Sequence, residues 1–174
     1  KKFLEKKEFS IMKKTIPLLT FGFIDWIEEQ DTKEKIIIEF GSGDSTIYFS
    51  NKFKKVITYE DEVEWINLIK SKGIDNVVVN YLDYNFYKKE PNYFTEADFI
   101  LIDNNPRNKN LRLYVAQNLI EKINYQNILI LDNSNWNSDC YFYLRTKYKS
   151  FKDFIGLNYK SETTVTSVFY DRAQ

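Results

Sequence analysis

Short apolar runs alternate with helix-like patterns along most of the chain. Runs rich in Ile, Val and Leu predict five buried strands: Ile36–Phe40, Val56–Tyr59, Asn76–Tyr81, Ala97–Asp103 and Asn127–Asp132. Apolar residues at helical spacing predict helices between and after them: 44–51, 61–72, 111–123 and 138–149. This repeated alternation of strand and helix is typical of a doubly wound, Rossmann-like α/β sheet.

The remaining segments predict an edge hairpin and a loop. Phe151–Leu157 and Val165–Tyr170 flank a polar turn, which favours an antiparallel pair at the edge of a mostly parallel sheet. Residues 83–96 are polar and aromatic and predict a loop over a site or a short irregular helix. The charged segment 1–14 predicts a surface helix or a frayed end. Because no linker divides the chain, we expect a single domain over residues 1–174.

Composition narrows the function classes. The chain has 25 basic and 25 acidic residues, so it lacks the overall positive charge of most nucleic-acid binders, and we expect no nucleic-acid partner. It has no histidine, which excludes Ser-His-Asp and Cys-His catalysis. Cys140 is the sole cysteine; we expect a small buried hydrophobic residue and a reducing, cytoplasmic location. The chain has no run of about 20 apolar residues, so the sequence predicts no membrane-spanning helix.

Glycine and acidic residues stand at the ends of the predicted strands, where open α/β sheets bind ligands. The first strand leads into Glu39–Gly43 and then Ser45 and Thr46, and the glycines permit a tight turn and close approach of a ligand. Tyr59, Glu60 and Asp61 end the second strand, and a carboxylate there can accept hydrogen bonds from both hydroxyls of a ribose. After the third strand, Leu82 and Asp83 can flank an adenine, and Asp103 faces the same crevice from the fourth.

The residue before the glycine turn favours S-adenosylmethionine (SAM) over NAD. Glu39 lies two residues before Gly41, where a carboxylate would repel a pyrophosphate but attract a sulfonium and an ammonium. Thr46 also occupies the third glycine position of the NAD fingerprint. A glycine turn without any ligand is the alternative.

Six motifs, spread over nearly the whole chain, resemble those of a poorly characterised bacterial branch of class I SAM-dependent methyltransferases. They are Pro17–Gly22, the E-F-G-S-G-x-S-T run Glu39–Thr46, the group Glu60, Asp61 and Trp65, the group Ile102, Asp103 and Arg107, the L-D-N-S run Leu131–Ser134, and Thr166–Tyr170. The resemblance implies a seven-stranded, mostly parallel sheet with an antiparallel C-terminal strand, and a methyl acceptor that enters over the strand ends. It also implies that Glu39 and Gly41 hold the methionine part of SAM, Glu60 the ribose and Asp83 the adenine edge. Asn104 and Asn105 depart from the glycine that often follows the aspartate.

Methyl transfer depends strongly on proximity and alignment, but an oxygen acceptor must also lose its proton. Asp103 and Asp132 end successive strands and could project into one crevice, so they are the candidate catalytic residues, with Tyr84 or a lysine as alternatives. Together with Asn133 the two aspartates could also hold Mg²⁺. Alternatively, Asp132 and Asn133 cap a loop while Asp103 contacts the cofactor.

Residues after the fourth and fifth strands bear on the acceptor. Asn104–Arg107 matches two of the four positions of the [DN]-P-P-[YFW] motif of nucleic-acid amino-methyltransferases. Three cationic residues could meet an anionic acceptor, or could lie on a solvated helix face: Arg107, Lys109 and Arg112. Trp136 and Tyr141 could line an acceptor pocket or belong to the core.

The sequence therefore predicts a cytoplasmic SAM-dependent methyltransferase that acts on a small-molecule or glycan-type acceptor. A SAM- or nucleoside-binding partner domain without activity is the first alternative, and a nucleic-acid methyltransferase is a weaker one. The sequence does not predict the oligomeric state.

Overall fold

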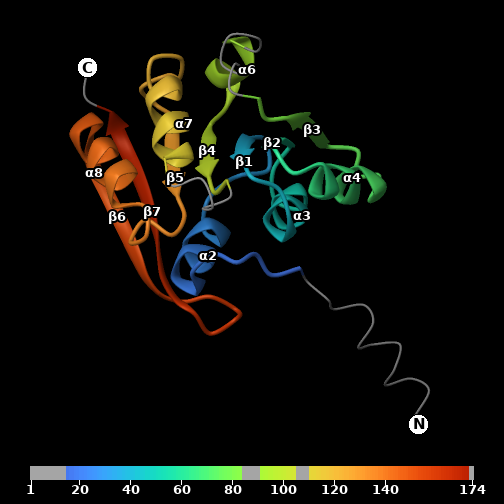
Figure 1. Ribbon diagram of the computed structural model, residues 1–174, viewed down its shortest axis with the longest axis horizontal. Coiled ribbons are helices and arrows are strands. Elements are labelled where there is room, and N and C mark those ends of the chain that lie inside the picture. The colour runs from blue at the N-terminus through green and yellow to red at the C-terminus, as the bar shows by residue number, and fades with distance from the viewer. Residues whose placement is uncertain (1–14, 84–90, 105–109, 173–174) are drawn as a thin grey trace.

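The computed structural model describes residues 15–83, 91–104 and 110–172. Seven strands form one sheet in the order β3-β2-β1-β4-β5-β7-β6 (Figure 1). The strands are β1 (Ile36–Phe40), β2 (Lys55–Glu60), β3 (Val77–Tyr81), β4 (Phe99–Ile102), β5 (Ile128–Leu131), β6 (Tyr148–Leu157) and β7 (Thr163–Arg172). The helices are α2 (Phe21–Glu28), α3 (Asp44–Ser50), α4 (Val63–Ser71), α6 (Pro91–Glu96), α7 (Leu111–Leu119) and α8 (Ser138–Lys147). The predicted roles of residues 1–14, Tyr84, Arg107 and Lys109 lie outside the described residues.

The five parallel strands are the five apolar runs of the sequence. β1 is an inner strand that pairs with β2 and β4, so that Ile38 is opposite both Ile57 and Ile100. All three side chains are buried, because helices cover both faces of a parallel sheet. The predicted Rossmann-like sheet is confirmed.

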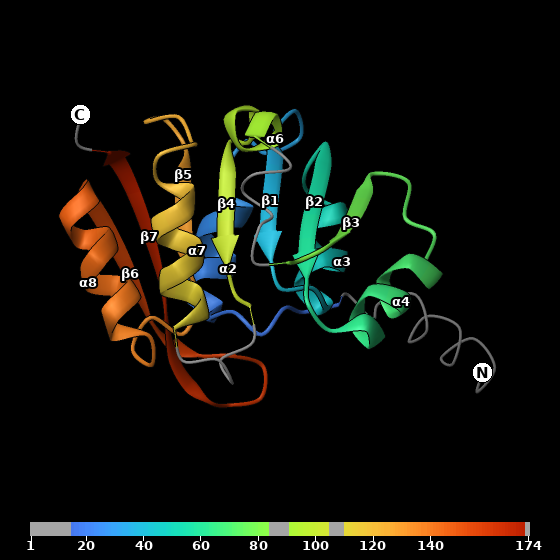
Figure 2. The same ribbon diagram turned by 45° about the horizontal axis from the view of Figure 1, so that its top comes forward.

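The last strand of the chain lies between two earlier ones. β7 pairs antiparallel with β5, where Ile130 is opposite Val168, and with β6, where Phe151 is opposite Phe169. The predicted antiparallel C-terminal strand is confirmed. Figure 2 shows the turn between β6 and β7 reaching past the carboxyl ends of the parallel strands.

Helices cover the two faces of the sheet with apolar side chains. On one face, α2 and α3 bury Phe23, Ile27 and Phe49 in one core cluster. On the other face, α7 and α8 bury Val115 and Leu144 in a second cluster (Figure 2). Within the residues that the structure describes, no helix is long and apolar enough to cross a bilayer.

All four helices predicted from the sequence are shorter in the structure: α3 ends at Ser50, and α8 ends at Lys147 because Tyr148 begins β6. The helix predicted from residue 61 begins at Val63, because Glu62 is extended and the Glu60 carbonyl oxygen, which an earlier helix start would use, accepts from Leu82 N instead. The helix predicted over 111–123 ends at Leu119. In the predicted loop 83–96, the described part contains the short helix α6.

Candidate functional site

The parallel strands end together at one edge of the sheet, here called the carboxyl edge. Ladder-type hydrogen bonds continue past the last residue of three strands: Gly41 N donates to Tyr59 O (2.8 Å), Asp103 N to Phe40 O (2.8 Å) and Asp132 N to Ile102 O (3.2 Å). The first residues after β1, β4 and β5 are therefore fixed to the neighbouring strands by main-chain hydrogen bonds.

The turn after β1, residues 41–43, presses directly on the end of β4. Gly41 has φ +100°, a conformation that side chains disfavour, and a Cβ atom there would lie 2.7 Å from the Asp103 carbonyl oxygen. The same atom would lie 3.1 Å from Asn104 N. Thr58 Oγ1 donates to Gly41 O at 3.0 Å and fixes the turn from below. Only glycine meets both the conformation and the space.

Glu39 lies beneath this glycine turn and is fully buried. Its two carboxylate oxygens accept hydrogen bonds from the hydroxyls of Ser45 and Thr46, the latter at 2.6 Å. Thr46 Oγ1 also accepts from Gly43 N at 3.0 Å, so the carboxylate shapes the turn through its neighbours. Burial raises the pKa of Glu39 to about 8. Direct contact between Glu39 and a cofactor stays a prediction; in this structure the side chain supports the turn.

Glu60 joins the turns that follow β1 and β2. Its Oε2 accepts from Ser42 N (2.7 Å) and Ser42 Oγ (3.0 Å), and its Oε1 accepts from the amides of Asp61 and Glu62, both at 2.9 Å. Burial raises the pKa of Glu60, and these backbone hydrogen bonds oppose the rise. A ribose diol at this strand end would compete with Ser42 for the carboxylate.

Aromatic rings form the floor below the two turns. Phe40 stacks on Tyr59 with ring centroids 5.4 Å apart, and on Phe94 at 6.4 Å. All three rings are buried, so Phe40 and Tyr59 would meet a ligand through their main chain. Leu82 is buried and Asp83 half-buried directly after β3, where the sequence predicts an adenine edge.

Arg112 ties the ends of β4 and β5 together. Its guanidinium donates to Asp103 Oδ1 (2.9 Å), to Asn104 O (2.9 Å) and to Asp132 O, and the side chain is only 2% exposed. The expectation that Arg112 lies on a solvated helix face or meets an acceptor is therefore wrong. Burial raises the pKa of Asp103, and the charge of Arg112 opposes the rise.

Asp132 is buried rather than open to the crevice, unlike the arrangement expected from the sequence. It is 1% exposed and accepts a hydrogen bond from Thr166 Oγ1 at 2.7 Å. Burial and then the nearby charge of Asp103 raise the pKa of Asp132 to about 8. A role for either aspartate as the base stays a prediction.

The structure gives the magnesium hypothesis no support. Asp103 is engaged by Arg112 and Asp132 by Thr166, while Asn133 donates its amide hydrogen to Thr164 Oγ1 at 2.8 Å. Among the residues placed in the structure, no group of three or more acidic or cysteine side chains could hold a metal ion.

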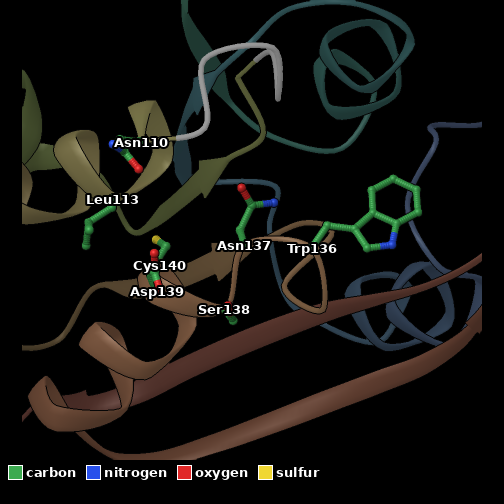
Figure 3. Close-up of a pocket in the computed structure, with 7 residues that line it drawn as sticks. All are labelled: Asn110, Leu113, Trp136, Asn137, Ser138, Asp139 and Cys140. Atoms are coloured by element: carbon green, nitrogen blue, oxygen red, sulfur yellow. The ribbon is translucent and has the colours of Figure 1, made fainter.

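A cavity of about 420 Å³ opens between the starts of α7 and α8 (Figure 3). Its lining consists of Asn110, Leu113, Trp136, Asn137, Ser138, Asp139 and Cys140. Trp136 thus lines a pocket, as one of its two predicted roles requires. Tyr141 instead packs on Phe151 and Phe169. Cys140 is buried, as predicted, and burial raises the pKa of its thiol to about 12.

Two buried polar groups beside the glycine turn have no hydrogen-bond partner among the described residues. They are Asp61 Oδ1, next to Glu60, and both polar atoms of the Asn104 side chain, at the end of β4. Burying such groups without a partner costs roughly 1–3 kcal/mol each, so a polar ligand at this edge would relieve them. The residues present therefore fit a polar cofactor bound over the glycine turn.

The fold is similar to that of solved methyltransferase structures. A putative O-methyltransferase from Klebsiella pneumoniae aligns with a TM-score of 0.66 and 13% identity over 87% of this chain and 77% of that one. An rRNA methylase from Streptococcus thermophilus aligns with a TM-score of 0.59 and 12% identity over 86% of this chain and 93% of that one. A putative methyltransferase from Streptococcus mutans in complex with SAH aligns with a TM-score of 0.58 and 12% identity over 86% of this chain and 94% of that one. No protein-family model and no curated protein matches the sequence.

At identities this low, the likeness establishes the fold alone. It agrees with the predicted Rossmann-like, seven-stranded and mostly parallel sheet. The chemistry must be argued from the residues at the carboxyl edge.

Proposed function

We propose that this chain is a SAM-dependent methyltransferase that acts on a small-molecule or glycan-type acceptor. The observation that carries the proposal is the glycine turn packed onto the end of β4, with Glu60 bridging it to the end of β2. In a doubly wound sheet this edge is where ligands bind. The fold likeness to methyltransferases, one of them in complex with SAH, supports SAM over other nucleosides.

The cofactor would lie across the ends of β1, β2 and β3. We propose that these residues hold it: Glu39–Gly43, Ser45, Thr46, Tyr59–Asp61, Leu82, Asp83 and Asp103. Gly41 and Gly43 allow the main chain to approach the ligand closely. Asp61 Oδ1 is a buried acceptor without a partner among the described residues, and a ribose hydroxyl would satisfy it.

SAM would supply an electrophilic methyl group. An acceptor oxygen would form a bond to that carbon as the carbon–sulfur bond breaks, and the oxygen's proton would pass to a base. Asp103 is our candidate for the base, because its side chain is 25% exposed and Arg112 fixes its position. Asp132 would act less directly, since its side chain is only 1% exposed and accepts from Thr166. A single domain and a cytoplasmic location also stay predictions.

Calorimetry with SAM tests the proposal, with NAD as the competing ligand. We expect SAM to bind and NAD not to bind. Glu60→Gln keeps the side-chain shape but removes acceptor sites, so it should weaken SAM binding at least about tenfold, the effect of losing one charged hydrogen bond. Glu64→Gln, an exposed residue in the first turn of α4, is the matched control and should bind SAM as the unmodified chain does.

Two outcomes would overturn the proposal. One is no heat of binding with SAM while circular dichroism shows a folded protein; the other is binding of NAD as tight as that of SAM. SAM binding without transfer to any acceptor would favour the non-catalytic binding domain. Salt-sensitive binding to RNA, titrated in the same buffer, would favour a nucleic-acid acceptor.

A further inference from the structure

The cavity between α7 and α8 lies beside the candidate methyl-transfer site. Arg112, which holds Asp103, neighbours the lining residue Leu113. Asn133, which follows Asp132, accepts hydrogen bonds from the main-chain amides of Trp136 and Asn137 through its carbonyl oxygen. The cavity therefore opens at the carboxyl edge, beyond β4 and β5. Its volume of about 420 Å³ falls in the range of about 300–1,000 Å³ that small-molecule sites occupy.

Asparagines at the starts of both helices present hydrogen-bonding groups to this cavity. Asn110 precedes α7 and Asn137 precedes α8, positions where an asparagine side chain usually caps the helix. Neither side chain makes a capping hydrogen bond. Asn137 donates its amide hydrogen to Asn133 O at 2.9 Å, which leaves its Oδ1 as an acceptor. The cavity thus offers amide donors and amide acceptors from two sides (Figure 3).

The charges at the cavity disfavour an anionic ligand. Among the described residues that line the cavity, Asp139 alone carries a charge. Arg112, which precedes the lining residue Leu113, is buried and already donates to Asp103, Asn104 and Asp132. The Asp139 carboxylate would repel a phosphate or carboxylate here, whereas a hydroxyl group could donate a hydrogen bond to it.

Trp136 adds an apolar surface to this polar lining. The side chain is 60% exposed although tryptophan is usually well buried. It lies next to Asn137 in the loop after β5 (Figure 3). In Figure 3 the indole extends from Asn137 on the side away from Asp139, so the Asn137 amide lies between the apolar surface and the carboxylate. Such a lining suits a ring that is apolar on its face and polar at its rim.

We propose that this cavity is the acceptor site and that it takes an uncharged saccharide ring. A sugar carries adjacent hydroxyls that both donate and accept, which matches the amides of Asn110 and Asn137 and the carboxylate of Asp139. Its C–H face would pack on Trp136. This inference rests on the proposed function, because it identifies the acceptor of that reaction.

Saturation-transfer NMR on the full chain with saturating S-adenosylhomocysteine tests the inference. The probes are the methyl glycosides of glucose, mannose, galactose and rhamnose, each at about 10 mM, where even a millimolar complex is populated. Glucose 6-phosphate and catechol are the charged and the aromatic comparison ligands. We expect saturation of the ring protons of at least one glycoside, with less transfer to both comparison ligands.

Variants locate the binding. Trp136→Ala and Asp139→Asn should each reduce the saturation at least fivefold. Tyr125→Ala removes an aromatic side chain that is 56% exposed and lines a different pocket, so it is the matched control and should change nothing. The inference is overturned if no glycoside is saturated, if glucose 6-phosphate or catechol is saturated more strongly, or if the signal survives in Trp136→Ala.

Calorimetry with SAM on the same preparations separates this inference from the proposed function. Trp136→Ala should bind SAM normally. If SAM binds and the glycosides do not, only the acceptor site is wrong; if SAM itself does not bind, the proposed function fails first.

Discussion

Replacing Arg112 with methionine should destabilise the fold by about 3 kcal/mol, because it leaves a buried carboxylate without its cation. The methionine keeps much of the apolar stem but loses every donor. Three acceptors lose a partner: the Asp103 carboxylate and the carbonyl oxygens of Asn104 and Asp132. The change therefore measures how strongly one side chain holds the ends of β4 and β5 together.

The magnitude follows from these three bonds. A hydrogen bond to a charged group contributes about 1.5–3 kcal/mol and one to a neutral carbonyl about 0.5–1.5 kcal/mol. Removing one partner of a buried ion pair costs about 3–5 kcal/mol. The Asp103 side chain is 25% exposed, so water can compensate part of the loss and the cost should fall at the lower end.

Urea unfolding at pH 7 measures the free energy of unfolding of this variant. Arg145→Met, at a more exposed arginine on α8, is the matched control and should cost less than about 1 kcal/mol. Asp103→Asn and the double variant complete a mutant cycle, which should give a coupling of about 1–3 kcal/mol between Arg112 and Asp103. A loss in Arg112→Met as small as the control's, or strictly additive effects, would refute the reasoning.

The pH dependence of the stability of the same variant is a second test, because the direction of the change can be predicted. Without the guanidinium, nothing offsets the rise that burial causes in the pKa of Asp103. A protonated Asp103 needs no cation, so the deficit of Arg112→Met should shrink as the pH falls from 7 towards 5. A deficit that grows on acidification would contradict this.

Three further predictions concern single residues. Burial raises the pKa of Glu39 from 4.5 to about 8, so between these pH values the folded state keeps a proton that the unfolded state releases. The free energy of unfolding should therefore fall as the pH rises from 4.5 to about 8. In urea unfolding, Glu39→Gln should show a shallower fall with pH, and equal slopes would contradict the assignment. Gly41→Ala should abolish SAM binding in calorimetry. In urea unfolding it should lower the free energy of unfolding by at least about 2 kcal/mol more than Gly73→Ala does, because both glycines have positive φ but only a Cβ atom at Gly41 would clash with the main chain of Asp103. Equal losses would exclude the clash. The buried Cys140, whose pKa burial raises to about 12, should react with a thiol reagent only after urea unfolding, and rapid labelling of the native chain would contradict its burial.

Much of the fold could be predicted because the strands of a parallel sheet have a characteristic apolar sequence. Runs such as Ile36–Phe40 are buried on both faces, so they are apolar throughout and easily recognised. The end of a helix depends on local competition that no periodicity records. The start of α4 is an example, since the Glu60 carbonyl oxygen that an earlier start would use is already paired with Leu82 N next to β3.

The candidate site was predicted by position but not by orientation. Glycines and carboxylates at strand ends locate the site, yet the sequence does not reveal that Glu39 and Asp132 point into the protein. The burial of Arg112 could have been predicted from its position in the helix, although its charge favoured a prediction of exposure. Arg112 shares helical spacing with Val115, Ala116 and Leu119, which are all buried, so its place on the apolar stripe of α7 indicated burial.

The position of β7 has a consequence for how the protein assembles during synthesis. Thr166 in this strand donates to Asp132, 34 residues earlier, and accepts a hydrogen bond from Thr20 N, 146 residues earlier. A nascent chain that has not yet released β7 from the ribosome leaves the edge of β5 open and Asp132 without that hydroxyl. Because β7 must insert between β5 and β6, the sheet cannot close in the order of translation. The candidate site is therefore completed only after β7, which follows the other six strands, has emerged, and until then an unpaired strand edge needs protection from other chains.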